Sequence, residues 1–230
     1  MDNPQVSTDT VHEPTADCVL AACNKFEREN ALTERALTEL FGQFPRNDNN
    51  AQILLKVVAV NSLYYTQILA VHDVARHIYE HGKDIDSALS AGSPEIVDTI
   101  AAVTIAATGK ERRNYSFASK YCSWHKPELY PIWDSRVRAY LIWLRQRPSG
   151  SFLVKNPDNW EHYREFLEMV TKLREVYGLG AGLGFKQIDK FLYAEGEKVM
   201  AQKDRLKRRH TSNASLGHCR PQGRMSGNAI

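Results

Sequence analysis

The stretch "YPIWDSRVRAYLIW", residues 130–143, gives the starting point for the fold. Asp134 follows Pro-Ile-Trp and precedes a run of apolar residues at helical spacing that also carries Arg136 and Arg138. An aspartate in front of such a run is favoured as a helix N-cap, because its carboxylate accepts hydrogen bonds from the N–H groups of the first turn. The stretch therefore predicts a helix that begins directly after Asp134.

Helical spacing of apolar residues recurs on both sides of this stretch, and no alternating run of strand length rivals it. The expected fold is all-α, a helical bundle. We expect residues 1–14 to be disordered, 15–202 to form one domain, and 203–230 to be a disordered basic tail, because the tail is polar and aperiodic. The helical segments are 15–30, 32–44, 51–82, 93–107, 116–124, 159–178 and 185–200.

Several classes of protein do not fit this sequence. No apolar run approaches the roughly 20 residues that a membrane span needs, so no membrane contact is expected. The first ten residues lack the features of a signal peptide, which makes the cytoplasm the expected location. The four cysteines form no Cys-x-x-Cys pair, so we expect neither a disulfide framework nor a metal or iron–sulfur cofactor.

Positive charge is concentrated in one part of the expected domain. The whole chain has a net charge of +3, yet residues 106–150 carry nine basic and three acidic residues, a balance of +6. Such concentration is what a surface that binds phosphates requires, although a solvated charged face has the same composition. The basic residues are Lys110, Arg112, Arg113, Lys120, Lys126, Arg136, Arg138, Arg145 and Arg147.

The order of segments around this charge suggests a clamp for a nucleic-acid backbone. A helix, the basic turn "GKERRNY" and a second helix are followed by a loop that leads to Asp134. The start of the second helix presents free backbone N–H groups, which form an anion site. Three cations in the turn and two short polar side chains complete a site that grips phosphates without reading bases. These residues are Lys110, Arg112, Arg113, Asn114 and Ser116.

This order resembles that of the helix-hairpin-helix DNA glycosylase superfamily, over roughly residues 50–145. In that family an aspartate opens the helix that follows the hairpin, as Asp134 does here. The segment "LLKVVAVNSLYYTQI" is similar to the family's first core helix, which implies that Asn61 faces the DNA. The family's Leu-Pro-Gly-Val-Gly hairpin and its four-cysteine motif are absent. The position of its Schiff-base lysine is taken by Asn114–Ser116, with Lys120 one helical turn later.

The resemblance implies a DNA glycosylase that acts on double-stranded DNA as a monomer. Asp134 would be the catalytic carboxylate, Lys120 a secondary candidate, and the displaced Lys120 favours a monofunctional enzyme. The substrate would be a damaged or modified base, removed in base-excision repair or in defence against phage DNA. A base flipped out of the duplex needs flat apolar walls. The expected walls are Tyr64, Tyr121, Trp124 and Trp133.

Other interpretations of the same residues stay open at this point. Asp134 can be a helix N-cap and no more, Lys120 a phosphate contact or an exposed charge, and the aromatic residues part of the core. A non-catalytic helix-hairpin-helix module that binds DNA is the main alternative, and a helical protein-interaction domain is a third. A pocket walled by aromatic residues beside Asp134, open towards the basic turn, would favour the enzyme.

Overall fold

The computed structural model describes residues 10–180 and 182–216, and for 209–216 only the course of the helix. These residues are mostly helical, which confirms the expected all-α class. The elements are α1 (Ala16–Gln43), α2 (Asn50–Tyr64), α3 (Val71–Glu80), α4 (Gly82–Ala91), α5 (Glu95–Ala101), β1 (Ala102–Ile105), β2 (Lys110–Arg113), α6 (Tyr115–His125), α7 (Ser135–Arg145), η1 (Pro148–Gly150), α8 (Tyr163–Val176) and α9 (Phe185–Leu216).

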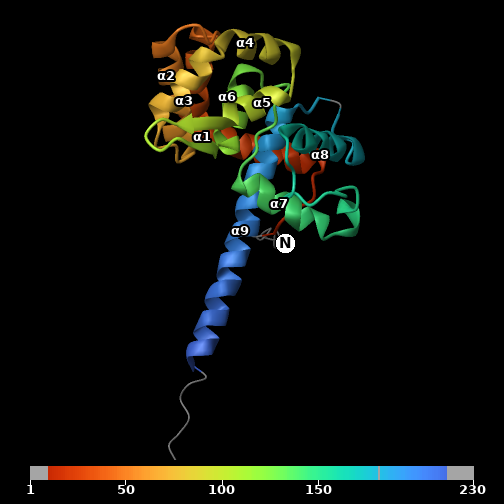
Figure 1. The fold of residues 1–230 in the computed structure, drawn as a ribbon. Coiled ribbons are helices and arrows are strands. Elements are labelled where there is room, and N and C mark those ends of the chain that lie inside the picture. The colour runs from red at the N-terminus through yellow and green to blue at the C-terminus, as the bar shows by residue number, and fades with distance from the viewer. Residues whose placement is uncertain (1–9, 181, 217–230) are drawn as a thin grey trace, which may run out of the picture.

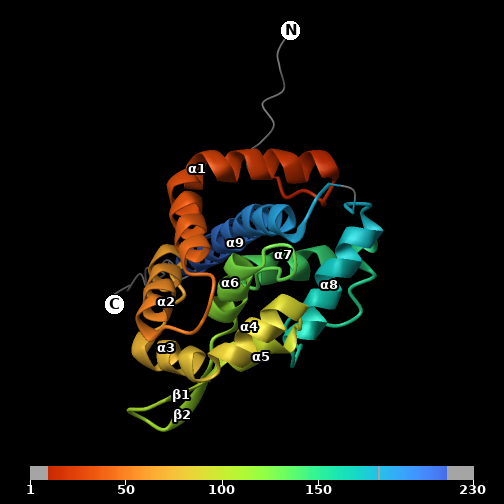
Figure 2. The same ribbon diagram turned by 90° about the horizontal axis from the view of Figure 1, so that it is seen from above.

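The last helix, α9, lies at the centre of the bundle. Its first half packs against α7 and α1 (Figure 1). Helix α1 is bent, and its two limbs follow two sides of α9 (Figure 2). The buried face of α9 carries Phe185, Ile188, Phe191, Leu192 and Val199, so its apolar stripe joins the core of the whole domain.

The segment after α5 differs from the prediction. Residues 102–113 form an antiparallel β-hairpin in which Ala102 pairs with Arg113 and Ile105 with Lys110, instead of a continued helix and a basic turn. Three consecutive β-branched residues in β1 favour the strand, and Gly109, with φ of 64°, allows the turn. The hairpin projects from the body beside α3 (Figure 2).

Both ends of the expected domain also differ. Residues 10–14, expected to be disordered, lie against the bundle: the His12 N–H donates to Glu195 Oε2 and the Tyr140 hydroxyl donates to the His12 carbonyl. Helix α9 continues through Leu216, well past residue 202, and its end extends away from the body (Figure 1). The other residues expected to be disordered, 1–9 and 217–230, lie outside the described part.

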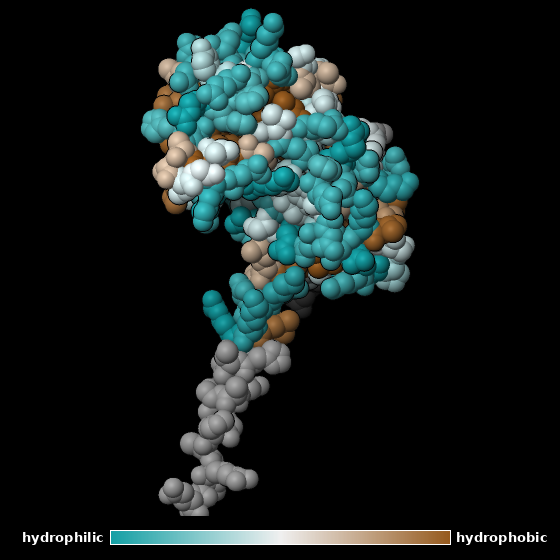
Figure 3. All heavy atoms as spheres, in the orientation of Figure 1, coloured by the Kyte–Doolittle hydropathy of each residue, from teal (hydrophilic) through white to brown (hydrophobic). Residues whose placement is uncertain are grey.

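The described part of the chain contains no helix long and apolar enough to cross a membrane. On the face drawn in Figure 3, hydrophilic residues predominate and hydrophobic residues form small separate patches.

A buried lysine fixes the turn between α1 and α2. Lys56 has no exposed surface, and its ammonium group donates to the carbonyls of Phe44 and Arg46 and to Asn47 Oδ1, at 3.0–3.1 Å. It also lies 3.2 Å from His125 Nε2. Burial, with the nearby Lys56 charge, lowers the pKa of His125 to about 3, so this imidazole is neutral.

Replacing this lysine should destabilise the fold. We expect Lys56→Met to lower the free energy of unfolding by about 1–3 kcal/mol, because it removes the donor that bonds the Phe44 and Arg46 carbonyls and the buried Asn47 side chain. Lys83→Met, on an exposed position of α4, should change it little. Urea denaturation of both variants measures the difference, and equal effects would contradict the bonding role of Lys56.

Helices α7 and α9 come into close contact at Gly196. A Cβ atom added there would lie 2.0 Å from the carbonyl oxygen of Arg136, so only glycine permits this approach. The contact seats the first turn of α7 on α9, and thereby brings Asp189, two turns earlier on α9, towards Asp134.

Adding a methyl group at this contact should separate the two helices. We expect Gly196→Ala to cost about 1–3 kcal/mol of unfolding free energy through overpacking. Gly42→Ala is the matched control, since nothing lies within 4 Å of its added Cβ, and alanine in a helix should stabilise by up to about 1 kcal/mol. Thermal denaturation checks both, and a Gly196→Ala variant as stable as wild type would contradict the close packing.

Candidate active site

The loop that leads into α7 is held by side chains from three helices and by its own Tyr130. Ser119 of α6 bonds the N–H and the carbonyl of Trp133, at 3.0 and 3.2 Å. The Tyr163 hydroxyl of α8 donates to the Pro131 carbonyl. Asp189 of α9 accepts from the Ile132 N–H at 3.0 Å. The hydroxyl of Tyr130, at the start of the loop, donates to two carbonyls at the end of α4, those of Ala88 and Ser93. The loop backbone, and with it the position of Asp134, is therefore fixed from several directions.

Asp134 is the N-cap of α7, as the sequence predicts. Its Oδ1 accepts from the N–H groups of Arg136 and Val137, both at 3.0 Å, and the residue is 7% exposed. Capping uses Oδ1 and leaves Oδ2 available for another partner. The capping bonds also fix the direction of the carboxylate, so the structural and the catalytic interpretations are compatible.

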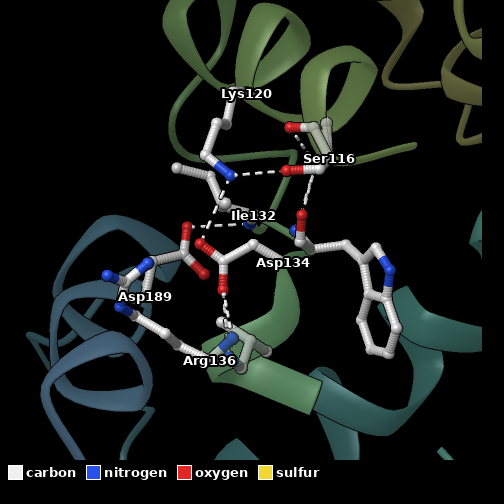
Figure 4. A network of polar contacts seen from close by, with 9 residues as sticks. Ser116, Lys120, Ile132, Asp134, Arg136 and Asp189 are labelled. Carbon is white, nitrogen blue, oxygen red and sulfur yellow. Dashed lines mark hydrogen bonds and ion pairs between the residues drawn. The ribbon is translucent and has the colours of Figure 1, made fainter. Parts of the chain in front are cut away.

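The second carboxylate oxygen faces a buried lysine. Lys120 Nζ lies 3.3 Å from Asp134 Oδ2 and donates to Ser116 Oγ at 3.0 Å (Figure 4). Burial lowers the pKa of Lys120, although the charge of Asp134 opposes that shift. The sequence analysis placed Lys120 one helical turn after the lysine position that the resemblance implies. In the structure the loop between α6 and α7 nevertheless brings Lys120 into contact with Asp134.

A small cavity of about 30 Å³ adjoins this pair, bounded by α1, α2, α6, α7 and α9. That volume holds about two water molecules, so a nucleobase fits only after the walls move. Ion pairs between α9 and α1 lie along the wall, with Lys186 and Lys190 each 3.4 Å from Glu34. The side chains that line it are Phe26, Glu34, Tyr64, Lys120, Ile132, Asp134, Val137, Lys186, Asp189, Lys190 and Tyr193.

Asp189 brings a third carboxyl group to the cavity, besides those of Asp134 and Glu34. It is 5% exposed, its Oδ2 accepts from the Ile132 N–H, and its Oδ1 has no hydrogen-bond partner among the described residues. Burial raises the pKa of Asp189 well above its usual range, and the nearby Asp134 adds to the shift. The described residues contain no cluster of three or more His, Cys, Asp or Glu that could hold a metal ion.

Of the four aromatic residues expected to wall the base pocket, only Tyr64 lines the cavity, with Lys120 Nζ 5.7 Å from its ring centroid. Tyr121 is fully buried and donates to Asn47 Oδ1, because it faces α1. Trp133 packs edge-on against Phe166 of α8. Trp124 lies behind the wall, beneath Lys186. Phe26 and Tyr193 occupy the places that the sequence analysis gave to these residues.

The expected phosphate-binding residues are only partly brought to the site. The three cations, Lys110, Arg112 and Arg113, lie exposed on β2, which leads directly into α6. Asn114 precedes α6 without a side-chain capping bond, and Ser116 contacts Lys120. Asn61 does not face outwards as expected. Its amide bonds the backbone of Ile68 and the hydroxyl of Thr66, because it closes the loop between α2 and α3.

Sequence reasoning missed Asp189, although a signal was present. It follows Phe185 by four residues and precedes Leu192 by three, so it lies on the apolar stripe of its helix. An acid within such a stripe is rarely buried without a purpose. Its closeness to Asp134 depends on tertiary packing across 55 residues, which no local pattern reveals.

Comparison with known proteins gives limited similarity. A family model described as the HI_0787 N-terminal domain matches residues 18–129. A relative from Haemophilus influenzae, itself described as an uncharacterized protein, is 34% identical over 139 residues. The match covers 60% of this chain and 63% of the relative, so the chain spans less than two thirds of that protein. No solved structure matches the chain.

The shifted pKa of Asp189 predicts how stability depends on pH. A carboxyl group that stays protonated when folded but ionises when unfolded makes stability fall as pH rises above about 4, the unfolded pKa. An asparagine in its place would be neutral in both states. We therefore expect Asp189→Asn to be more stable than wild type at pH 8, with the difference vanishing as pH falls to 4. Thermal melting across this range tests it, and a difference independent of pH would contradict a protonated Asp189.

Proposed function

We propose that this protein is a DNA glycosylase that cleaves the N-glycosyl bond of a damaged or modified base flipped out of double-stranded DNA. The contact of Lys120 Nζ with Asp134 Oδ2, 3.3 Å apart beside a cavity with aromatic walls, is the observation that carries the proposal. An amine nucleophile next to a carboxylate is suited to displacing a base from a sugar carbon that develops positive charge.

The pair can divide the work of the reaction between its two members. Because burial lowers the pKa of Lys120, a larger fraction is present as the free amine, which can attack C1′. Asp134 stabilises the positive charge that develops on the sugar. The sequence spacing favours a monofunctional enzyme that uses water, whereas the position of Lys120 beside Asp134 supports the amine as nucleophile.

DNA would approach over the exposed cations that precede α6. Lys110, Arg112 and Arg113 lie on β2, so a phosphate backbone bound there lies next to the helix that carries Lys120. This β-hairpin takes the place of the helix-hairpin-helix turn in the proposal. The acting form is proposed to be a cytoplasmic monomer that serves base-excision repair or defence against phages with modified bases.

The cavity must widen to accept a base. Lys190 pairs with Glu27, whose side chain is 59% exposed, so this ion pair can separate at a modest cost. The pairs of Lys186 and Lys190 with Glu34 are more buried and cost more to separate. Widening between α1 and α9 leaves Lys120 and Asp134 in place, because the loop before α7 fixes them independently of α1.

The test is release of base from duplexes that each carry one alkylated, oxidised, mismatched or phage-type modified base. We expect Asp134→Asn to lower the release rate by about 10²-fold or more. Asparagine caps a helix as well as aspartate does, so the fold should persist. The control is Asp98→Asn, which should keep activity. Asp98 lies outside the cavity and accepts from the Tyr115 hydroxyl and the Tyr163 N–H.

Borohydride reduction during turnover separates the two nucleophiles. A covalent protein–DNA adduct that forms in wild type and is lost in Lys120→Gln supports the amine, while base release without an adduct would show that water attacks. Unchanged release by Asp134→Asn would rule out its catalytic role. Salt-sensitive DNA binding without release from any duplex would favour the non-catalytic binding module.

A further inference from the structure

Asp189 is placed to act on whatever enters the cavity. It lies on α9, opposite Lys120 of α6 and beside Asp134 of α7, and all three side chains line the same cavity (Figure 4). One of its oxygens, Oδ2, is occupied by the Ile132 N–H at 3.0 Å. The other, Oδ1, is buried without a partner among the described residues. A buried polar atom in this state calls for an explanation, and a ligand in the cavity supplies one.

The hydrogen-bond pattern determines which oxygen carries a proton. A neutral carboxyl group offers one O–H donor and one carbonyl acceptor. Since Oδ2 must accept from the Ile132 N–H, the proton is on Oδ1. Burial and the charge of Asp134 raise the pKa of Asp189 against the opposing effects of the Ile132 N–H, Lys186 and Lys120, and the raised pKa favours the protonated form. Asp189 therefore offers an O–H donor beside the cavity.

The hydrogen bonds of these two aspartates differ. Asp134 accepts from two backbone N–H groups and from Lys120 Nζ, contacts that suit a carboxylate. Asp189 accepts from one backbone N–H only. Two carboxyl groups whose environments differ in this way are suited to opposite roles in acid–base chemistry. The titratable groups around Asp189 are Glu34 of α1, Tyr64 of α2, Lys120 of α6, Asp134 of α7, Tyr163 of α8 and Lys186 of α9.

We propose that Asp189 is a second catalytic residue, a general acid that protonates the departing nucleobase from Oδ1. This inference rests on the proposed glycosylase function and adds a role that the Lys120–Asp134 pair does not supply. Breaking an N-glycosyl bond leaves an electron pair on the base, and a neutral base is a poor leaving group unless that pair or a conjugated atom gains a proton.

The step balances in atoms and charge. The bond between C1′ and the base nitrogen breaks, and its electron pair moves to the base. The Oδ1 proton of Asp189 moves to a nitrogen or oxygen acceptor of that base, which leaves neutral. Lys120 as the free amine, or water, forms the new bond to C1′ and passes the proton that it loses to Asp134, 3.3 Å from Lys120 Nζ. Asp189 becomes a carboxylate. It regains a proton from solvent after the base departs, and no oxidant or metal takes part.

A purely structural role for Asp189 is the alternative, because its bond to Ile132 also holds the loop before Asp134. Asp189→Asn separates the two roles. The asparagine carbonyl can still accept from the Ile132 N–H, and its NH₂ group can still donate into the cavity, but it cannot transfer a proton. Glu195→Gln is the matched control: a buried acid on the same helix, bonded to His12 and Lys198 and outside the cavity.

The experiment is single-turnover release, between pH 6 and 8, of the base that wild type removes fastest from the duplexes described above. We expect Asp189→Asn to be about 100-fold slower at pH 7.5. The ratio of wild-type to variant rates should shrink by about tenfold for each unit that the pH falls, because solvent protons replace the lost acid. Glu195→Gln should match wild type.

The outcomes separate this inference from the function on which it rests. A rate ratio that stays constant with pH, or an Asp189→Asn variant as fast as wild type, would overturn the acid role while leaving the glycosylase intact. No release by wild type would overturn both. Carbon-13 NMR of labelled aspartate, with the Asp189 signal assigned by its loss in Asp189→Asn, gives a reading without turnover. A protonated carboxyl at pH 7 supports the inference, and an ionised one contradicts it.

Discussion

The site depends on the backbone of residues 130–133 being held in one conformation. This loop has no regular secondary structure, and its polar groups are bound by side chains from α6, α8 and α9. Each of those bonds lies in the interior, where water cannot replace a missing partner, so losing one leaves a buried group unsatisfied. The loop in turn sets the position of Asp134, and Lys120 then needs only to extend from α6 to reach it. Packing around the loop therefore sets the distance between Lys120 and Asp134.

Asp189 connects this packing with the proposed reaction. One carboxyl group both accepts the loop's N–H and keeps its other oxygen unpaired beside the cavity, so support of the loop and the proposed supply of a proton are combined in one side chain. The glycine contact between α9 and α7 keeps that side chain near Asp134. Burying an acid here has a cost in stability, since the unfolded chain would ionise it freely. Buried acids with shifted pKa values, which lower the stability of the fold, are characteristic of functional sites.

The sequence predicted those features of the fold that depend on residues close together in the chain. The cap at Asp134 and the helix after it follow from neighbouring residues, and so does the helical class of the fold. The β-hairpin was missed because its strands have four residues each, too few for a periodic signal, and one of them is a run of charge. The length of α9 was missed because its last turns lack an apolar stripe. Most residues that line the cavity were not predicted, because Phe26 and Tyr193 come together from positions 167 residues apart. The tryptophans predicted to wall a base pocket instead pack elsewhere, Trp133 against Phe166 and Trp124 beneath Lys186.

The central position of α9 has a consequence for how the protein is made. A ribosome delivers the chain from its N-terminus, and early segments begin to fold before later ones emerge. Here α9 follows α1 and α7 along the chain, so the faces of α1 and α7 that pack on it stay uncovered until Phe185 and the residues after it leave the exit tunnel. The cavity, which needs Asp189, therefore forms only after α9 has been synthesised.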